Sequence, residues 1–380
     1  MINRKLDLRS INESLFLWGP RQTGKTSLLK TQFPAATYID LLKSDEFVQY
    51  SKKPSLLREH VEYKKPDKLI IDEIQKVPPL LDEVHWLIEN TNTQFILCGS
   101  SARKLKQGHA NLLGGRAFRR TLRGLTAHEL EEEFKLETAL NHGYLPKIYL
   151  SKNPDEYLRA YVTDYLKEEI SAEGLVRNLP SFSEFLDLAS LSDTEMISYS
   201  SFARDVGVSQ PTIKSYFQIL IDTMIGEFLP AFIKKPKRRV IQAPKFYFFD
   251  VGVVRKLTKR GWVEPGNELF GKAFENWVFH ELCCYRDYLN PDLEISYWKL
   301  PSGIEVDFIL NNMEVAIEVK GRDNINSSHL KGLKEVIKDH KKIKRRILVC
   351  LENKPRKTED GIEILPYTEF LHLLWNRKII

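Results

Sequence analysis

A glycine-rich segment near the start of the chain has the spacing of a phosphate-binding loop. Residues 19–26 follow the pattern G-x-x-x-x-G-K-[ST], after an apolar run and before a helical pattern. Backbone amides of such a loop surround phosphate, the Lys25 ammonium reaches the β- and γ-phosphates, and the Thr26 hydroxyl ligates Mg²⁺. We therefore predict ATP and Mg²⁺ as cofactors, with a binding set of Gly19, Pro20, Arg21, Gln22, Thr23, Gly24, Lys25, Thr26 and Ser27.

Two acids follow an apolar run in the segment KLIIDEIQKVP, residues 68–78. We expect a buried strand that ends at these acids. Asp72 would hold the water shell of Mg²⁺, and Glu73 would orient or deprotonate the attacking water. A further apolar run, residues 94–101, contains Ser100 near its end. Parallel strands present functional residues at their carboxyl ends, so Ser100 or Ser101 would sense the γ-phosphate; an ordinary strand-end turn is the alternative.

Charged side chains also recur in a hairpin pattern at residues 303–321. Alternation of apolar and charged residues predicts two strands joined by a two-residue turn at 311–312. In that register Glu305 lies opposite Glu318, and Asp307 lies diagonal to Glu318, close enough for their side chains to converge.

This hairpin has the residue types of a metal-dependent phosphodiesterase. Asp307 and Glu318 would hold Mg²⁺ through oxygen ligands, the metal would activate water, and Lys320 would position that water or stabilise negative charge. Glu275, on the flank of an amphipathic helical pattern at residues 267–285, offers a further acid. The alternative is the solvated face of an edge hairpin, where alternating Glu and Lys are common.

Three segments, WGPRQTGKTSLL, LIIDEIQKVP and FILCGSSARKL, resemble a family of prokaryotic AAA-type ATPases. The C-terminal half of that family is a domain of unknown function (4143) with a restriction-endonuclease-like end, and the resemblance covers nearly the whole chain. It implies that Ser100 is a sensor residue and that Arg116, or else Arg119, is a finger supplied to a neighbouring subunit of a homo-oligomer. Solvated or phosphate-contacting arginines are the alternative. D-x10-E-V-K at residues 307–320 then resembles the PD-(D/E)xK nuclease motif, with Glu275 as its helix acid.

Residues 198–229 have the pattern of a helix-turn-helix. Ser200 or Ser201 is expected to cap a first helix, Gly207 to make the turn, and Ser209 to cap a second helix. The outward polar residues of the second helix, expected to contact DNA, include Gln210, Thr212 and Lys214. A basic wing between two strands would neutralise phosphates with Lys234, Lys235, Lys237, Arg238 and Arg239. Alternatively, the winged helix packs on the ATPase as a lid and the basic run is solvated.

Bulk composition predicts a cytoplasmic globular protein. The chain is 42% hydrophobic and 28% charged, and no apolar run approaches the ~18 residues that span a bilayer. The charged N-terminus lacks the apolar core of a signal peptide. The four cysteines lack metal-ligand spacing, which indicates reduced thiols. The net charge of +6 is compatible with a polyanionic partner.

We therefore predict an α/β protein of three domains. Residues 1–150 would form a parallel-sheet P-loop NTPase domain of AAA type, residues 151–245 a helical and winged-helix domain, and residues 246–380 a mixed α/β restriction-endonuclease-like domain. The expected function is ATP hydrolysis coupled to action on nucleic acid, with DNA as the expected form, and Mg²⁺-dependent nuclease activity. An ATP-dependent DNA-binding or regulatory switch with an inactive nuclease fold is one alternative, and an ATP-driven protein-interaction module is another.

Overall fold

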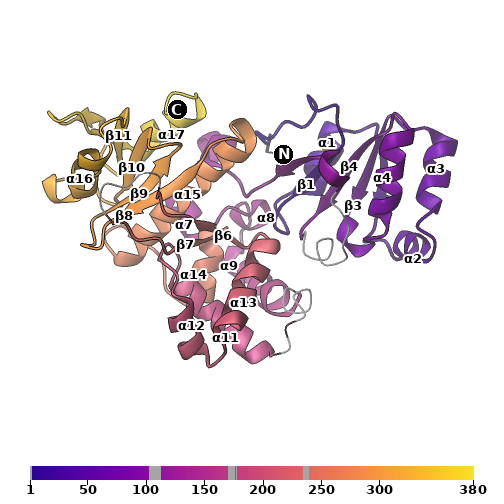
Figure 1. Cartoon of the computed structure of the whole chain (residues 1–380), viewed down its shortest axis with the longest axis horizontal. Helices are drawn as coiled ribbons and strands as arrows, with labels where there is room; N and C mark the ends of the chain where they lie inside the picture. The colour runs from indigo at the N-terminus through magenta and orange to yellow at the C-terminus, as the bar shows by residue number, and fades with distance from the viewer. Residues whose placement is uncertain (1, 102–112, 170–175, 177, 234–238) are drawn as a thin grey trace.

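The computed structural model describes residues 2–101, 113–169, 176, 178–233 and 239–380. Two sheets stand at opposite ends of the molecule, and a group of helices lies below and between them (Figure 1). Within the described residues no helix is both long and apolar enough to cross a membrane.

The N-terminal unit is a five-stranded parallel sheet in the order β2-β3-β4-β1-β5. The strands are β1 (Leu15–Trp18), β2 (Thr37–Asp40), β3 (Lys68–Asp72), β4 (Gln94–Gly99) and β5 (Phe118–Thr121). The helices are α1 (Lys25–Gln32), α2 (Ser44–Lys52), α3 (Leu56–Lys64) and α4 (Leu80–Asn90). All residues of β1 and β4 are buried, as expected for strands covered on both faces. The predicted parallel sheet is confirmed, and it brings the carboxyl ends of β1, β3 and β4 to one edge.

A helical unit follows, built on aromatic packing around Phe185 and Phe217. Two preceding helices, α6 (Ala127–Leu130) and α7 (Leu136–His142), place their buried apolar residues in the core of the C-terminal unit. The first helices of the helical unit itself are α8 (Pro146–Tyr149), α9 (Pro154–Ala160) and a π-helix (Tyr161–Glu169). Its later elements are α11 (Leu179–Leu191), α12 (Tyr199–Val206), α13 (Gln210–Asp222), β6 (Gly226–Leu229), β7 (Lys245–Phe248) and α14 (Val251–Leu257). The antiparallel pair β6 and β7 encloses residues 230–244. The expected domain boundary after residue 245 falls inside β7, whose Phe246 and Phe248 belong to this helical core.

The helix-turn-helix pattern corresponds to α12 and α13. Gly207 has a φ of 69°, a left-handed conformation that ends α12 at low steric cost. Ser209 caps α13, with its Oγ accepting from the Thr212 amide at 3.3 Å. The predicted cap of α12 was wrong. Ser198 is the cap, accepting from the Ser201 amide at 3.4 Å, because the helix begins earlier in the serine-rich run than expected.

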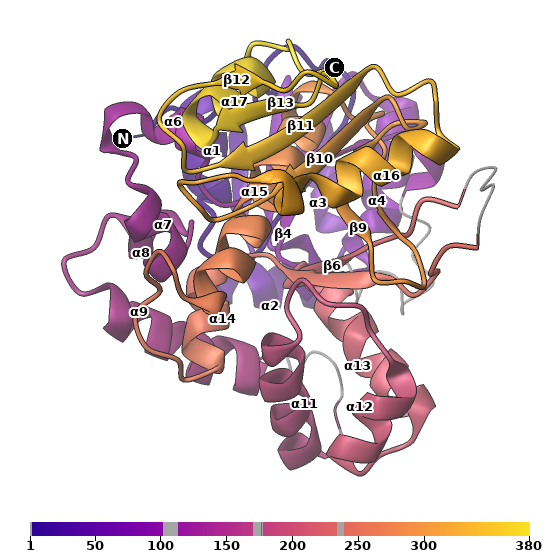
Figure 2. The same cartoon turned by 90° about the vertical axis from the view of Figure 1, so that its left-hand side faces the viewer.

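The C-terminal unit is a mixed sheet in the order β12-β13-β11-β10-β9-β8. Its elements are α15 (Glu268–Leu289), β8 (Ile295–Lys299), β9 (Glu305–Leu310), β10 (Val315–Val319), α16 (Lys331–Asp339), β11 (Arg345–Cys350), β12 (Arg356–Lys357), β13 (Glu363–Pro366) and α17 (Tyr367–Trp375). Helices α15 and α17 share one hydrophobic core with the sheet, and α16 shares another. Figure 2 views this sheet with α16 on the near side.

The predicted register of the β9–β10 hairpin was wrong. A two-residue turn would pair Leu310 with Met313, whereas the structure pairs Leu310 with Val315. The turn is longer because Asn311 and Met313 both adopt positive φ, 52° and 61°. Extending the observed register by one pair places Asp307 directly opposite Glu318 rather than diagonal to it.

Candidate functional site

The glycine-rich loop lies between β1 and α1, in the strand-loop-helix context that a phosphate-binding loop requires. Gly24 has a φ of 91°, which favours glycine at this position. The Lys25 ammonium is buried in the loop and donates to the carbonyl oxygens of Gly19 and Pro20, at 2.8 and 2.9 Å. Burial lowers the pKa of Lys25. The loop therefore presents a folded cradle with its lysine already turned inward.

Thr26 and Asp72 meet at the edge of this loop. The Thr26 Oγ1 donates to the Asp72 Oδ2 at 2.7 Å, and the Tyr38 hydroxyl donates to the same carboxylate oxygen. Asp72 is only 3% exposed. The two residues predicted to hold Mg²⁺ are thus adjacent, and hydroxyl and carboxylate oxygens are suitable ligands for this ion. Burial and the neighbouring Asp72 raise the pKa of Tyr38, so its hydroxyl stays protonated.

Glu73 and Ser100 are joined by a residue that the sequence analysis missed. The Gln75 Nε2 donates to the Glu73 carboxylate and lies 3.3 Å from the Ser100 Oγ. Gln75 and Ser100 are both buried, whereas Glu73 is half-buried. Glu73 adopts a φ of 60°, which turns the chain sharply after β3. The available signal was a glutamine two residues after Glu73, because an amide that is buried there needs polar partners.

A pocket of about 420 Å³ adjoins the loop on its other side. Its polar lining includes Thr23, Gly24 and Ser27, and its apolar lining includes Leu28, Leu125, Pro146 and Leu150. The pocket combines an apolar surface with polar groups next to the phosphate loop, which are the features of a small-molecule site.

Arg4 fixes the loop from outside and was also missed. Its guanidinium donates to the Thr23 carbonyl at 2.7 Å and pairs with Glu129 at 3.0 Å. It also donates to the Arg123 carbonyl at 2.7 Å and to the Tyr288 hydroxyl at 3.3 Å. An arginine in a charged N-terminal segment has no sequence motif, so these long-range contacts gave no signal.

The two candidate finger arginines lie on the surface near β5. Arg116 pairs with Glu89 at the end of α4, and Arg119 is exposed on β5. Exposure leaves either side chain accessible to a second copy of the chain, so the finger role remains a prediction.

The predicted C-terminal acids are brought together with Lys320. The Lys320 ammonium lies 2.5 Å from the Glu318 Oε1, and the Asp307 Oδ2 accepts from the Val319 amide at 2.8 Å. Glu275 reaches the cluster from α15, where its Oε1 accepts from the Tyr247 hydroxyl at 2.6 Å. The sequence therefore identified a real cluster of residues, although in a different register.

A lysine outside the predicted set also enters this cluster. The Lys245 ammonium lies 3.1 Å from the Glu275 Oε1 and 3.9 Å from the Asp307 Oδ1, and it also pairs with Glu305. The Lys245 side chain is 4% exposed. Burial opposes its charge, but these carboxylates outweigh burial and raise the pKa of Lys245. An isolated lysine at the start of an apolar strand offered no indication of these partners.

Three acids of the cluster, Glu275, Glu305 and Glu318, have shifted pKa values. Burial, followed by repulsion from Asp307, raises the pKa of Glu318 to about 8. Burial also raises the pKa of Glu275, against the attraction of Lys245. Burial alone would raise the pKa of Glu305, but Lys245 and then Lys299 lower it.

The cluster does not have the arrangement of a metal site. Among the described residues, no group of three or more His, Cys, Asp and Glu side chains is placed to hold a metal ion. Lys245 and Lys320 instead contact the carboxylates that were predicted to bind Mg²⁺. The Glu318 Oε2 is buried and accepts no hydrogen bond from the residues that the structure describes.

The predicted DNA-contacting residues are placed only in part. On α13, Gln210 and Lys214 are exposed and Thr212 is half-buried, while Ile213 and Phe217 are buried as expected. Arg239 is exposed. The remaining wing residues, Lys234, Lys235, Lys237 and Arg238, lie outside the described residues.

Comparison with protein families divides the chain into three consecutive parts. An AAA domain model matches residues 12–131. The N-terminal part of the chain contains an AAA domain. Two domains of unknown function, DUF8612 and DUF4143, match residues 133–264 and 270–370. The expected AAA and DUF4143 parts are therefore confirmed, while the winged helix and the nuclease fold remain predictions.

Several curated proteins are similar to this chain. An uncharacterised protein of Mycobacterium tuberculosis is 23% identical over 324 residues, covering 81% of this chain and 68% of its own length. An uncharacterised protein of Haemophilus influenzae is 24% identical over 386 residues, covering 93% and 92%.

Solved structures give weak similarity. The ORC1 protein of Aeropyrum pernix in complex with DNA has 13% identity and a TM-score of 0.25, with 66% of this chain and 87% of that chain covered. The replication initiator DnaA bound to AMPPCP and single-stranded DNA has 14% identity and a TM-score of 0.28, with 57% and 84% covered. These TM-scores are too low to support an argument about this chain.

Proposed function

We propose that this chain is an ATP-binding and ATP-hydrolysing protein of AAA type that acts on DNA. The observation that carries the proposal is the contact between Thr26 and Asp72, 2.7 Å apart at the edge of a loop that already encloses Lys25. A phosphate-loop hydroxyl and a strand-end carboxylate brought together from sequence positions far apart form the metal-nucleotide corner of a P-loop ATPase.

Hydrolysis would use side chains with separate tasks. The loop amides and Lys25 bind the phosphates, with the ammonium moving from the Gly19 and Pro20 carbonyls to phosphate oxygens. Thr26 and Asp72 would hold Mg²⁺, which offsets charge on the β- and γ-phosphates. Glu73 orients the attacking water and accepts its proton.

A pocket, a buried glutamine and an arginine from a neighbouring copy would complete the ATP site. The pocket of about 420 Å³ beside Ser27 receives the base and ribose. Gln75 transmits the presence of the γ-phosphate between Ser100 and Glu73, because its amide contacts both side chains. Arg116 would complete the site of a neighbouring copy, so the active form would be a homo-oligomer.

The DNA surface would be the winged helix formed by α12, α13 and the β6–β7 hairpin. Gln210 and Lys214 are exposed near the start of α13, and Arg239 is exposed next to the basic run. Together with the net charge of +6, these residues favour binding through phosphate contacts. Base readout from the helix would contribute less to affinity.

The C-terminal cluster favours a regulated nuclease-like unit over a constitutively active one. Asp307, Glu318 and Lys320 gather as a nuclease would need, but Lys245 contacts the acids that a metal would use. An ATP-driven DNA-binding switch with a closed nuclease-like site is therefore the function that the geometry supports best.

The test measures DNA affinity and DNA cleavage in the same preparation. Fluorescence anisotropy with duplex DNA, without nucleotide and with ATP or ADP, should give an affinity that depends on nucleotide and falls steeply with salt. Linear, supercoiled and branched DNA incubated with Mg²⁺ or Mn²⁺ should remain largely uncut. Binding without salt dependence would favour the protein-interaction alternative, and rapid cleavage by the unmodified chain would contradict a closed site.

A further inference from the structure

Lys245 joins two parts of the chain that the sequence separates. It begins β7, in the hairpin of the helical unit, while its three carboxylate partners lie on α15 and β9. The contacts are 3.1 Å to Glu275 and 3.9 Å to Asp307, together with the ion pair to Glu305. A single ammonium is thus shared by three acids.

The other two lysines of the cluster, Lys299 and Lys320, are more exposed than Lys245 and each pairs with one carboxylate. Lys299 pairs with Glu305 and Lys320 pairs with Glu318, each at 2.5 Å. Their side chains are 20% and 32% exposed, whereas the Lys245 side chain is 4% exposed. Lys245 is therefore the buried cation of the cluster. Without it, the cations that the described residues offer to Glu275, Glu305, Asp307 and Glu318 would be Lys299 and Lys320, at the edges of the cluster.

One carboxylate oxygen is left available by this arrangement. Within the described part of the chain, the buried Glu318 Oε2 accepts no hydrogen bond, in a residue that is 6% exposed. A buried carboxylate oxygen is costly to leave without a partner. Metal coordination would satisfy it, since hard divalent cations prefer carboxylate oxygens.

We propose that Lys245 is a tethered cation that occupies a latent divalent-cation site, so that Glu275, Asp307 and Glu318 bind Mg²⁺ or Mn²⁺ only when β7 carries the lysine away. The inference rests on the proposed nuclease-like role of the same cluster and adds its regulation. The lysine competes with the metal because both neutralise the same acids.

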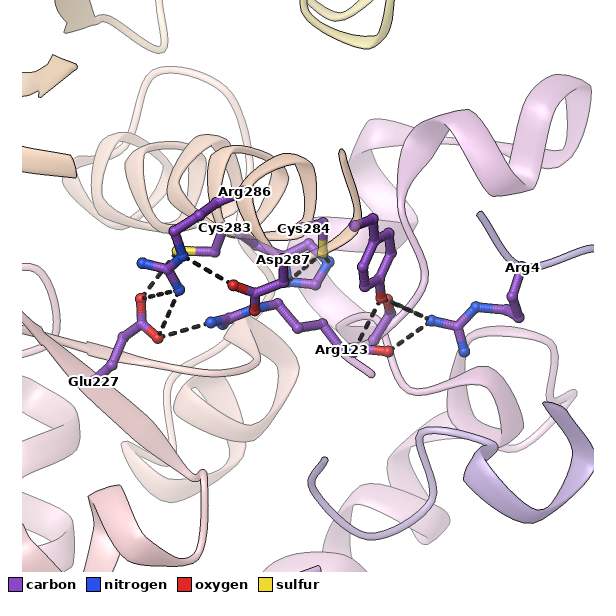
Figure 3. A network of polar contacts seen from close by, with 10 residues as sticks. Arg4, Arg123, Glu227, Cys283, Cys284, Arg286 and Asp287 are labelled. Carbon is purple, nitrogen blue, oxygen red and sulfur yellow. Dashed lines mark hydrogen bonds and ion pairs between the residues drawn. The ribbon is translucent and has the colours of Figure 1, made fainter. Parts of the chain in front are cut away.

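A network of polar contacts also connects Glu227, on the hairpin that carries Lys245, with Arg123 and Arg4 (Figure 3). Glu227 on β6 pairs with Arg123 at 2.7 Å, and Arg123 pairs with Asp287 of α15 at 2.6 Å. The Arg123 carbonyl accepts from Arg4, which also contacts the phosphate loop at Thr23. These contacts connect the phosphate loop to β6, which pairs with β7.

The decisive experiment compares Mn²⁺ binding to the nucleotide-free full-length wild type and to Lys245→Met, by electron paramagnetic resonance. Methionine is similar in length but uncharged. We expect one additional Mn²⁺ site in Lys245→Met, at least about tenfold tighter than any wild-type binding to the cluster. Asp307→Asn added to Lys245→Met should abolish that site. Lys299→Met is the matched control, since it removes the same charge but leaves Lys245 in place.

Each other result would overturn the inference: wild type binding Mn²⁺ as tightly as Lys245→Met, no added site in the folded variant, or an equal gain in Lys299→Met. If Lys245→Met is too unstable to purify folded, it is refolded with millimolar Mn²⁺. Metal-dependent folding supports a latent site, and failure to fold with Mn²⁺ contradicts it. ATP affinity measured on the wild type reports separately on the proposed ATPase function, because it does not depend on this cluster.

Discussion

Glu227 and Tyr247 face each other across the β6–β7 hairpin, and each contacts a different functional region. The Glu227 carboxylate pairs with Arg123, which follows the last strand of the N-terminal sheet. The Tyr247 hydroxyl donates to Glu275 at 2.6 Å in the C-terminal cluster. A single cross-strand pair therefore contacts both Arg123, next to the N-terminal sheet, and the carboxylate cluster.

Glu73→Gln should separate ATP binding from hydrolysis. Glutamine retains the shape of the side chain and its contact with Gln75 but cannot accept the proton of the attacking water. We expect ATP affinity within a few-fold of wild type and phosphate release slowed by about 100-fold. Glu62→Gln, an exposed carboxylate on α3, is the matched control. Equal losses of affinity and turnover in Glu73→Gln would instead assign Glu73 to structure.

Arg123→Gln should destabilise the junction of the three parts. The guanidinium pairs with Glu227 at 2.7 Å and with Asp287 at 2.6 Å, and its loss leaves both acids to Arg286, which pairs with each of them at 3.4 and 2.9 Å. The free energy of unfolding should fall by about 2 kcal/mol. Urea unfolding followed by circular dichroism measures this change. Arg204→Gln removes an exposed guanidinium that pairs with its neighbour Asp205, and it should have little effect; equal stability of the two variants would contradict a structural junction.

Lys214→Ala should weaken DNA binding across all sequences. The residue is exposed near the start of α13, where its ammonium would contact a phosphate. The slope of log affinity against log salt should decrease by roughly one. Lys338→Ala on α16, also an exposed lysine, controls for net charge. The same slope change in both variants would show that α13 is not the DNA-binding surface.

Glu281 should make stability decline toward alkaline pH. This buried carboxyl on α15 accepts from the Ala127 amide at 2.7 Å and from the Trp375 indole at 2.9 Å. Burial raises its pKa from 4.5 to about 8. Between pH 4.5 and about pH 8 the folded state keeps the Glu281 proton, whereas the unfolded chain has released it. Glu281 therefore contributes fully to the free energy of unfolding below the pKa of the unfolded chain, and this contribution is lost as pH rises through the folded-state pKa.

Glu281→Gln tests whether this residue makes stability decrease as pH rises. The amide cannot titrate, and its NH₂ group faces one of the two donors, so the variant should melt below wild type at about pH 5. The difference in Tm should narrow by about pH 8.5, because only wild type loses stability with pH. Glu264→Gln, an exposed carboxylate, is the control. A constant Tm difference over the range would show that Glu281 has an ordinary pKa.

The parts that sequence predicted well are those set by local pattern. The phosphate loop needs consecutive residues around Lys25, and Asp72 and Ser100 follow apolar strands whose parallel arrangement brings their ends together. The apolar face of α13 follows from helical periodicity, which places Ile213 and Phe217 inside.

The parts that sequence missed depend on contacts between distant segments. Lys245 meets acids on α15 and β9, and Arg4 reaches Arg123 and Tyr288, yet each is an isolated basic residue in the sequence. The β9–β10 register depended on the positive φ of Asn311 and Met313, which lengthens the turn. Neither residue is glycine, so alternation alone gave the shorter turn.

The central claim is that residues 19–26 form a working ATP site, and Lys25→Ala tests it most directly. Calorimetric titration with ATP and Mg²⁺, followed by phosphate-release kinetics, should compare this variant with wild type and with Lys64→Ala, an exposed lysine on α3. We predict that wild type and Lys64→Ala bind and hydrolyse ATP, while Lys25→Ala loses at least about tenfold in affinity and nearly all turnover. Full ATP affinity and turnover in Lys25→Ala would contradict the account.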